Sequence, residues 1–591
     1  ALLVSLLAIA SGFAIAVTQS SANLHRSIDR TYEELSLCDL SVHTVPVSAD
    51  SVREVSAVEG VRCAEGRLLR ESRLVDTGAM GLLIGIDHRR HPLINDVRVV
   101  RGSFLSSGGL EALVEEHYAD SHGIGPGDTI VTMTGGMTLT LRVVGVVLSP
   151  EYLYVMGDPA HLFPDESSFG AIFVPLTLLQ NALDLEGRVN NILILADEPG
   201  EVYDRIVHDG EPPDVAGNIV RVDRRGDIWS VWALENDIHG FDELNALVTT
   251  LVLIIGGSAM GITMARIVAS HGREIGILMA MGAPAGGIVT YYLLTALVIG
   301  LMGVAVGAFL GLALSWWIVQ YYSSALNVPV IAFRPDAAVY AQNILYAMAV
   351  IMAASAVPAV RAARSRPHEA IRLVTADSPG ISGRALRSAP LVPKIALRNL
   401  CRRKWRSSVT SFGIGLSLVI PFSIAAIFTS IDHTIEVGFE EEHWDQLVPF
   451  THLVNTSEAE GLSGVEGIGR VEPILVTYGL VGERYYTFRG IDQENTLSRL
   501  NIVEGTRFTG PDTMIVDEKV AREQGLHVGD TVVIPFPLGP LTVRVVGVNS
   551  VILQGVCYLP RETLQNHTYP GKVSAALVTG DATGGEDLPF V

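Results

Sequence analysis

The chain has 591 residues, of which 48% are hydrophobic and 18% are charged, and its formal net charge at pH 7 is −21. This acidic balance argues against a nucleic-acid-binding protein, which needs a basic surface. The hydrophobic residues gather in blocks of twenty or more, which is typical of a membrane protein with water-soluble domains.

The chain opens on such a block, and residues 1–21 are predicted to form the first membrane span. The sequence ALLVSLLAIASGFAIAVTQ has no Met and no basic residue before it. A cleaved signal peptide has a similar hydrophobicity and stays open as an alternative. The later spans favour a transmembrane helix whose cytoplasmic start is missing. A long polar segment, residues 22–243, follows it.

Three further spans are predicted at residues 244–269, 287–320 and 337–360. The turn between the first two of these, residues 270–286, contains REIGILMAMGAP. Its apolar part covers about 10 Å as a helix, whereas a bilayer core is about 30 Å thick. We therefore expect a short apolar helix in this turn, headed by Arg273 and Glu274, that does not cross the membrane.

A basic linker at residues 361–408 fixes the orientation of the chain. It carries twelve Lys or Arg residues and two acidic residues, which leaves 30 basic and 61 acidic residues elsewhere. By the positive-inside rule this linker is cytoplasmic. A fifth span is predicted at residues 409–432, followed by a second polar segment, residues 433–591. Both large polar segments are then predicted to lie outside the cell, and the turn at 270–286 is predicted to lie in the cytoplasm.

The two external segments resemble each other. GIGPGDTI at 123–130 matches GLHVGDTV at 525–532, and LRVVGVV at 141–147 matches VRVVGVN at 543–549, both at an offset of 402 residues. The equal spacing indicates two copies of one domain. Alternating runs predict strands and DEKVAREQG predicts a short helix ending on Gly525, so each copy is expected to be a mixed α+β domain. The second copy is expected to be incomplete at residue 591, with three more spans beyond it.

A search for catalytic motifs finds no G-x-x-x-x-G-K-[ST], H-E-x-x-H, paired C-x-x-C or G-x-S-x-G. We therefore expect no enzyme activity, no cofactor and no metal site in this chain. His88 and His91 lie close together but lack a third ligand, which favours a solvated loop. A disulfide between Cys38 and Cys63 stays open.

The predicted third span carries Gly303, Gly307 and Gly311, a spacing that allows another helix to approach closely. Glycine is also common in membrane helices for no such reason, and this alternative stays open. Spans two to five have no Asp, Glu, Lys or Arg in their middle, which argues against an ion pathway through them.

The order of these segments is similar to that of a known family. A span, a large external domain and three spans, with REIGILMAMGA after the second span and PAVRAARSRPHEAIR after the fourth, resembles the FtsX/MacB-type ABC transporter permease. The external copies are similar to the MacB-type periplasmic core domain, and a second module begins at ALRNLCRRKWRSSVTSFGIGLSL. The resemblance implies a multi-span α-helical membrane protein with two homologous mixed α+β extracytoplasmic domains, in the cytoplasmic (inner) membrane.

In this family the short helix after the second span is the coupling helix, which docks on an ABC ATP-binding subunit. The resemblance assigns that role to Arg273, Glu274, Gly276, Leu278, Ala280, Met281 and Gly282. The alternative is that the stretch packs against helix ends or lies among lipid headgroups. ATPase activity is then expected in a separate subunit, and the two modules are expected to form an intramolecular pseudo-dimer.

Three functions remain open from the sequence. The first is a permease that couples ATP hydrolysis by its partner to movements of its external domains, exporting or extracting a lipid, lipoprotein or peptide. The second is a mechanotransmission signalling protein that regulates an external partner such as a cell-wall hydrolase. The third is a membrane-anchored adhesion or binding protein with no ATPase.

Overall fold

The structure is a computed structural model that describes residues 2–134, 136–153, 169–325, 328, 330–364, 443–465, 467–498, 500–550 and 555–580, with scattered positions between 411 and 433. The chain divides into two compact units. One is Ala1–Arg30 with Glu235–Ser430, and the other is Thr31–Leu234 with Ile431–Val591. Most of the predicted basic linker and of the fifth span lies outside the described residues.

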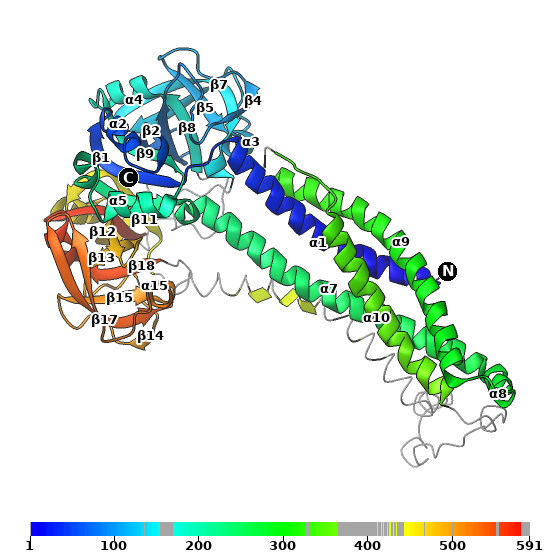
Figure 1. Ribbon diagram of the computed structural model, residues 1–591. Coiled ribbons are helices and arrows are strands. Elements are labelled where there is room, and N and C mark those ends of the chain that lie inside the picture. The colour runs from blue at the N-terminus through cyan, green and yellow to red at the C-terminus, as the bar shows by residue number, and fades with distance from the viewer. Residues whose placement is uncertain are drawn as a thin grey trace. The chain divides into compact units, whose positions relative to one another are not determined.

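Four helices in the described part of the chain are long and apolar enough to cross a membrane. They are α1 (Leu2–Glu34), α7 (Trp229–Ser270), α9 (Ala285–Ala325) and α10 (Ala337–Ala363), with the short α8 (Gly272–Ala280) between α7 and α9 (Figure 1). At 1.5 Å per residue α7 and α9 are each about 60 Å long, which is twice the thickness of a bilayer core. Both helices therefore extend beyond a membrane.

The first helix is longer than the predicted span, since α1 ends at Glu34 and not near residue 21. Residues 22–34 contain neither Pro nor Gly, and a continued helix satisfies their backbone groups. Within the first unit, polar side chains at the end of the predicted span and in this extension bind the extended segment before α10. Gln19 Nε2 donates to the Arg334 carbonyl at 3.0 Å, and Asn23 Oδ1 accepts from the Arg334 N–H at 3.1 Å. Ser27 Oγ accepts from the Ala332 N–H at 3.0 Å.

In the second unit, residues 40–224 build a ten-stranded sheet. Its strand order is β10 (Ile219–Arg224), β1 (Leu40–Ser48), β9 (Arg188–Ala196), β2 (Val61–Leu74), β3 (Met80–Ile86), β8 (Phe169–Pro175), β5 (Glu111–Glu115), β7 (Met137–Leu148) and β4 (Arg98–Gly102), with β6 (Thr129–Thr134) paired to β2 and β7. The helical segments around it are α2 (Ser51–Ser56), α3 (Glu116–Ser121), η1 (Pro150–Tyr152), α4 (Leu176–Ala182), α5 (Pro199–Val207), α6 (Pro213–Ala216) and η2 (Arg225–Asp227).

Residues 446–580 build a nine-stranded sheet with the same strand order, except that this sheet has no strand corresponding to β10 among the described residues. The order is β11 (Gln446–Asn455), β19 (Lys572–Gly580), β12 (Ile468–Val481), β13 (Arg484–Ile491), β18 (Val556–Pro560), β15 (Thr513–Asp517), β17 (Gly539–Asn549) and β14 (Ile502–Gly505), with β16 (Thr531–Phe536) paired to β17. Its helical segments are α14 (Thr456–Glu460), η3 (Gly461–Gly464), α15 (Glu518–Gln524) and α16 (Arg561–His567).

The matching of the two domains extends to their turns. The glycine turn before β6 has Gly127 at φ 106°, and the turn before β16 has Gly529 at φ 105°, a conformation that favours glycine. Asp128 Oδ2 accepts from the Gly125 N–H at 2.8 Å in the first turn, and the equivalent bond in the second turn has the same length. The α15 helix ends where predicted, on Gly525 at φ 63°.

Each sheet encloses its own apolar core. The first core includes Leu83, Val114, Tyr118 and Ile172, all at most 1% exposed. The second includes Phe488, Met514, Val516 and Leu559, each fully buried. These residues come mostly from strand positions with buried side chains, so each domain closes around the centre of its sheet.

The two cysteines of the first domain are free. Cys38 directly precedes β1 and Cys63 lies on β2, while β9 runs between these two strands. Two strand spacings separate them by about 10 Å. A disulfide requires Cα atoms within about 7 Å, so the sheet keeps the two thiols apart. Burial, with Glu151 nearby, raises the pKa of the Cys38 thiol to about 12.

Candidate functional site: the short helix between α7 and α9

One residue, His271, separates α8 from α7, and α8 ends at Ala280, shortly before Gly282. Gly282 has φ 95°, and its N–H donates to the Met279 carbonyl at 3.0 Å, while the Ala283 N–H donates to the Leu278 carbonyl at 3.0 Å. These two bonds form a Schellman motif, which needs a left-handed residue at the position of Gly282. The glycine therefore ends α8 sharply before α9 begins.

One face of α8 anchors it to the helix bundle. Ile275 is 4% exposed and Gly276 is also buried. Ile275 belongs to a buried cluster to which the three neighbouring membrane helices contribute, namely Met260 and Met264 of α7, Ile288, Tyr292 and Ala296 of α9, and Ala359, Ala362 and Ala363 of α10. The Tyr292 hydroxyl also lies 3.4 Å from His271 Nδ1, at the start of α8. The helix thus has a fixed orientation against the bundle.

The opposite face is apolar and exposed. Ile277, Leu278 and Met281 are 43%, 47% and 73% exposed, and Glu274 is exposed beside them. The spacing 274, 277, 278, 281 places these four side chains on one side of a helix. This face is charged at its start and apolar along the rest of its length.

The predicted coupling residues do not all lie on this face. Arg273, Glu274, Leu278, Ala280, Met281 and Gly282 are exposed, whereas Gly276 is buried against the bundle. Ile277 is exposed and was not among the predicted residues. Its position three residues after Glu274 and four before Met281 is the sequence signal that could have found it.

The glycine stripe of α9 faces α1 within the first unit. A Cβ atom added at Gly303 would lie 2.7 Å from Leu7 Cβ, and one at Gly311 would lie 2.7 Å from the Gly12 carbonyl oxygen. At Gly307 the nearest atom would be Ser11 Oγ, which would lie closer still. These distances are shorter than real Cβ contacts, so the two helices approach closely only because the three positions lack side chains.

The two sheet domains contact each other within the second unit. The Tyr203 hydroxyl donates to the Glu483 carbonyl at 2.8 Å, and Arg484 lies 3.7 Å from Asp227. The guanidinium of Arg221 lies 4.4 Å from the centre of a tyrosine ring of the second domain, Tyr478. A second ion pair joins Arg224 and Glu483 at 4.0 Å. The contact therefore combines a hydrogen bond, ion pairs and a cation–π interaction.

Comparison with known proteins matches two parts of the chain. Residues 246–367, which contain α8, match the FtsX-like permease C-terminal family. Residues 407–589 match the MacB-like periplasmic core domain family. The two matches support an FtsX/MacB-type permease. The family predicted from the sequence motifs and the repeat is thereby confirmed.

This permease also resembles individual proteins. It is 30% identical over 156 residues to the uncharacterized ABC transporter permease YknZ of Bacillus subtilis, a match that covers 25% of this chain and 37% of the length of that relative. The periplasmic region of MacB from Actinobacillus actinomycetemcomitans matches at 20% identity and a TM-score of 0.19, covering 22% of this chain and 67% of its own. The extracellular domain of the ABC-type transporter YknZ from Gram-positive bacteria matches at 14% identity and a TM-score of 0.21, covering 29% of this chain and 93% of its own.

Other residues that sequence reasoning considered have ordinary surroundings. His91 stacks on Phe104 with ring centres 4.1 Å apart, and its Nδ1 lies 3.0 Å from Asp96. Among the described residues no group of three or more His, Cys, Asp or Glu side chains is arranged to hold a metal ion.

Proposed function

We propose that this permease is the membrane subunit of an ABC transporter and that α8 docks a separate ATP-binding subunit in the cytoplasm. The observation that carries the proposal is the exposed apolar face of α8, Ile277, Leu278 and Met281, on a helix whose other face is anchored. An exposed apolar face of this kind marks an interaction site. The charges of Arg273 and Glu274 at its edge would orient the partner. ATP hydrolysis would take place in that partner.

Exposed aromatic residues of α9 support a position of α8 at the cytoplasmic surface of the membrane. Tyr291 is 60% exposed near the start of α9, and Trp316 and Trp317 are 52% and 58% exposed near its end. The two groups are about 37 Å apart along the helix, close to the thickness at which aromatic belts flank a bilayer. The contact of Tyr292 with His271 supports the same level for the start of α8.

The external domains would carry out the work on the substrate. We propose a multi-pass protein of the cytoplasmic (inner) membrane, with both sheet domains outside, that exports or extracts a lipid, lipoprotein or peptide. The α9 helix contains no Asp, Glu, Lys or Arg, and α10 contains only Arg361. This lack of charged residues favours a mechanism in which the external domains move, and it argues against a polar substrate pathway through the helices. The contact of Tyr203 with Glu483 supports a pseudo-dimer of the two domains in one chain.

A charge reversal on α8 tests the docking role. We expect Glu274→Lys to reduce co-purification of the ATP-binding subunit by about tenfold or more, because it changes the charge at the edge of a small interface. The matched control is Glu518→Lys, an exposed glutamate in the first turn of α15 in the second sheet domain. Membrane insertion should be normal in both variants. Full retention of the ATPase by Glu274→Lys and by Met281→Lys would refute the assignment.

A second assay separates transport from signalling. The purified complex in lipid nanodiscs is tested for ATP hydrolysis in the presence of candidate lipids, lipopeptides and cell-wall hydrolases. Stimulation by lipids or lipopeptides supports export or extraction of such a substrate. Stimulation by a hydrolase alone would replace this proposal with the signalling function.

A further inference from the structure

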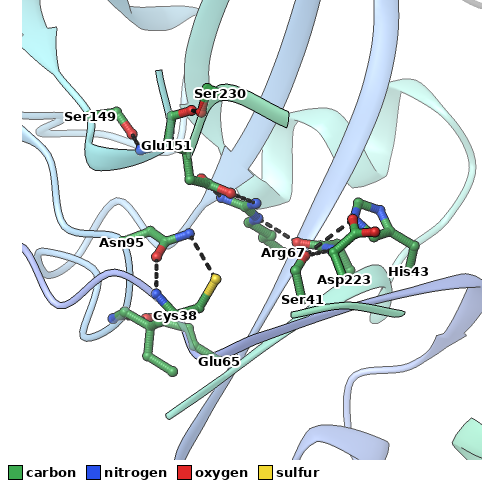
Figure 2. A network of polar contacts seen from close by, with 12 residues as sticks. Cys38, Ser41, His43, Glu65, Arg67, Asn95, Ser149, Glu151, Asp223 and Ser230 are labelled. Atoms are coloured by element: carbon green, nitrogen blue, oxygen red, sulfur yellow. Dashed lines mark hydrogen bonds and ion pairs between the residues drawn. The ribbon is translucent and has the colours of Figure 1, made fainter. Parts of the chain in front are cut away.

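A buried ion pair lies inside the first sheet domain. Arg67 on β2 donates to the Glu151 carboxylate of η1 from its two terminal nitrogens, Nη1 and Nη2, at 2.5 and 2.6 Å (Figure 2). Its Nε donates to Asn191 Oδ1 on β9 at 2.6 Å. The Arg67 and Glu151 side chains are 6% and 7% exposed. Burial alone lowers the pKa of Arg67, but the Glu151 carboxylate outweighs it and raises that pKa.

The polar contacts continue from this pair in both directions. On one side Asn191 Nδ2 donates to Ser41 Oγ on β1 at 3.0 Å. On the other side the Glu151 backbone carbonyl accepts a hydrogen bond from the Ser230 hydroxyl, in the first turn of α7 (Figure 2). The series of contacts therefore runs from the sheet through η1 to the start of a predicted membrane helix. Both ends lie within the second unit.

The second sheet domain serves as an internal comparison. Arg67 faces Asn191 across β2 and β9, and at the corresponding register Ile474 faces Ala575 across β12 and β19. By the same register Leu447 of β11 corresponds to Ser41 of β1. These three apolar residues pack together in one cluster. The fold thus closes without polar side chains at these positions.

This comparison bears on the reason for the ion pair. A buried ion pair is costly to desolvate, and apolar residues of similar volume often give equal or greater stability. The second domain shows that such residues fit this fold. Stability of the sheet therefore does not explain Arg67 and Glu151, whereas the contact with Ser230 offers a reason. A bidentate pair fixes the backbone of η1, and that backbone carries the carbonyl that Ser230 binds.

We infer that the Arg67–Glu151 pair is a clamp that fixes the first turn of α7 to the first sheet domain. Arg67 and Glu151 are positioning residues that act through the Glu151 carbonyl, and Ser230 is the group they hold. The second domain has no such pair at the described positions. The functional importance of this clamp rests on the proposed function, in which α7 connects the external side to α8.

Hydrogen exchange measured by mass spectrometry on the whole chain in nanodiscs tests the clamp. The single variants Arg67→Met and Glu151→Met should lower the thermal unfolding midpoint, since each leaves one buried charge unpaired. The double variant R67M/E151M should recover that midpoint. Amide hydrogen exchange at residues 229–234 should nevertheless be about tenfold faster in the double variant than in the unchanged chain, because η1 no longer holds the Glu151 carbonyl in place for Ser230.

Two further variants make the result decisive. Ser230→Ala should give the same fast exchange at 229–234 with an unchanged midpoint, and Ile474→Met in the second domain should change neither quantity. Normal protection of residues 229–234 in the double variant would overturn the clamp. The measurement needs no ATPase, so its failure is distinct from failure of the docking role of α8.

Discussion

His43 is a half-buried histidine next to the edge strand of the first sheet. It lies on β1 with its Nε2 atom 3.3 Å from Asp223 Oδ2 and 3.4 Å from Arg221 Nη2, both on β10. Burial lowers the pKa of His43, and Arg221 and Arg67 lower it further, although Asp223 acts in the opposite direction. Burial also opposes ionisation of Asp223, but Arg221 and His43 outweigh it and lower the pKa of that carboxyl.

The lowered pKa of His43 predicts how stability depends on pH. The unfolded chain binds a proton at His43 near pH 6.5, and the folded chain binds it only at lower pH. Stability should therefore fall as the pH drops below about 6.5, by at most about 1.4 kcal/mol per pH unit for this one proton. Asp223 adds a loss only at more acidic pH, below its unfolded pKa.

The measurement is the thermal unfolding midpoint at pH 7.5 and pH 5.5. We expect the difference between the two values to be smaller for His43→Gln than for the unchanged chain. The control is His527→Gln, whose side chain is 79% exposed, and it should keep the full difference. An equal difference in all three proteins would contradict a depressed pKa at His43.

The sequence of α8 does not indicate which of its apolar residues are buried. Ile275, Ile277 and Leu278 are all apolar, and the sequence alone gives them similar roles. The structure buries Ile275 against α7, α9 and α10 and leaves the other two exposed. This separation depends on which side of α8 meets the bundle. Charge and hydropathy could identify the segment but not its docking face.

Among the elements, the pair α1 and α9 depends on small residues. Gly307 faces Ser11 and the Ala8 carbonyl of α1, and its missing side chain permits that approach. We expect Gly307→Leu to destabilise the bundle by about 1–3 kcal/mol, because the added atoms overpack the contact. The readout is the thermal midpoint of the chain in nanodiscs.

The control is Gly286→Leu in the same helix, where an added Cβ atom meets nothing within 4 Å. This variant should change the midpoint much less than Gly307→Leu does. Equal midpoints for the two variants would mean that the stripe reflects only the usual abundance of glycine in membrane helices.

The extension of α1 beyond residue 21 is an element that the sequence did not predict. Gln19, Asn23 and Ser27 repeat every four residues and therefore lie on one face of the helix. Their partners are the backbone groups of Ala332 and Arg334, about 310 residues away in sequence. The sequence could have predicted that these three polar residues share one helix face. It could not have predicted their partner, because the partner lies far away in sequence and is brought close only by folding.

For the whole molecule, the testable quantity is the side of the membrane on which each part lies. In a chain with its four cysteines replaced by serine, we place a single cysteine by Glu186→Cys in the first sheet domain or by Arg364→Cys after α10. Both positions are exposed. Because the basic linker is expected in the cytoplasm, a membrane-impermeant thiol reagent should label intact cells only at position 186.

Labelling at position 364 from outside would reverse the proposed orientation and would remove α8 from the cytoplasm. Labelling at both positions only after cell lysis would place the first sheet domain inside. Denaturing lysis provides the internal control, since both cysteines should then react fully. The outcome decides the topology independently of any partner protein.

The repeat shows what the sequence could predict about the two sheet domains. Motifs at a constant offset of 402 residues indicated two related mixed α+β domains, and the two sheets have the same strand order with matching glycine turns. The differences between the copies were not predicted. Arg67 and Ile474 occupy the same register, yet their sequence neighbourhoods gave no signal of a polar network in one copy and an apolar cluster in the other.

The sequence by itself determined the apolar helices, the short apolar segment between two of them, the recurring motifs of the two sheet domains and the family. These features depend on local composition, periodicity and short motifs, which are properties of neighbouring residues. Only the tertiary structure decided which face of α8 is exposed, that β9 separates Cys38 from Cys63, and that Arg67 meets Glu151 and, through it, Ser230. Each of these depends on contacts between residues far apart in sequence, and packing selects those contacts.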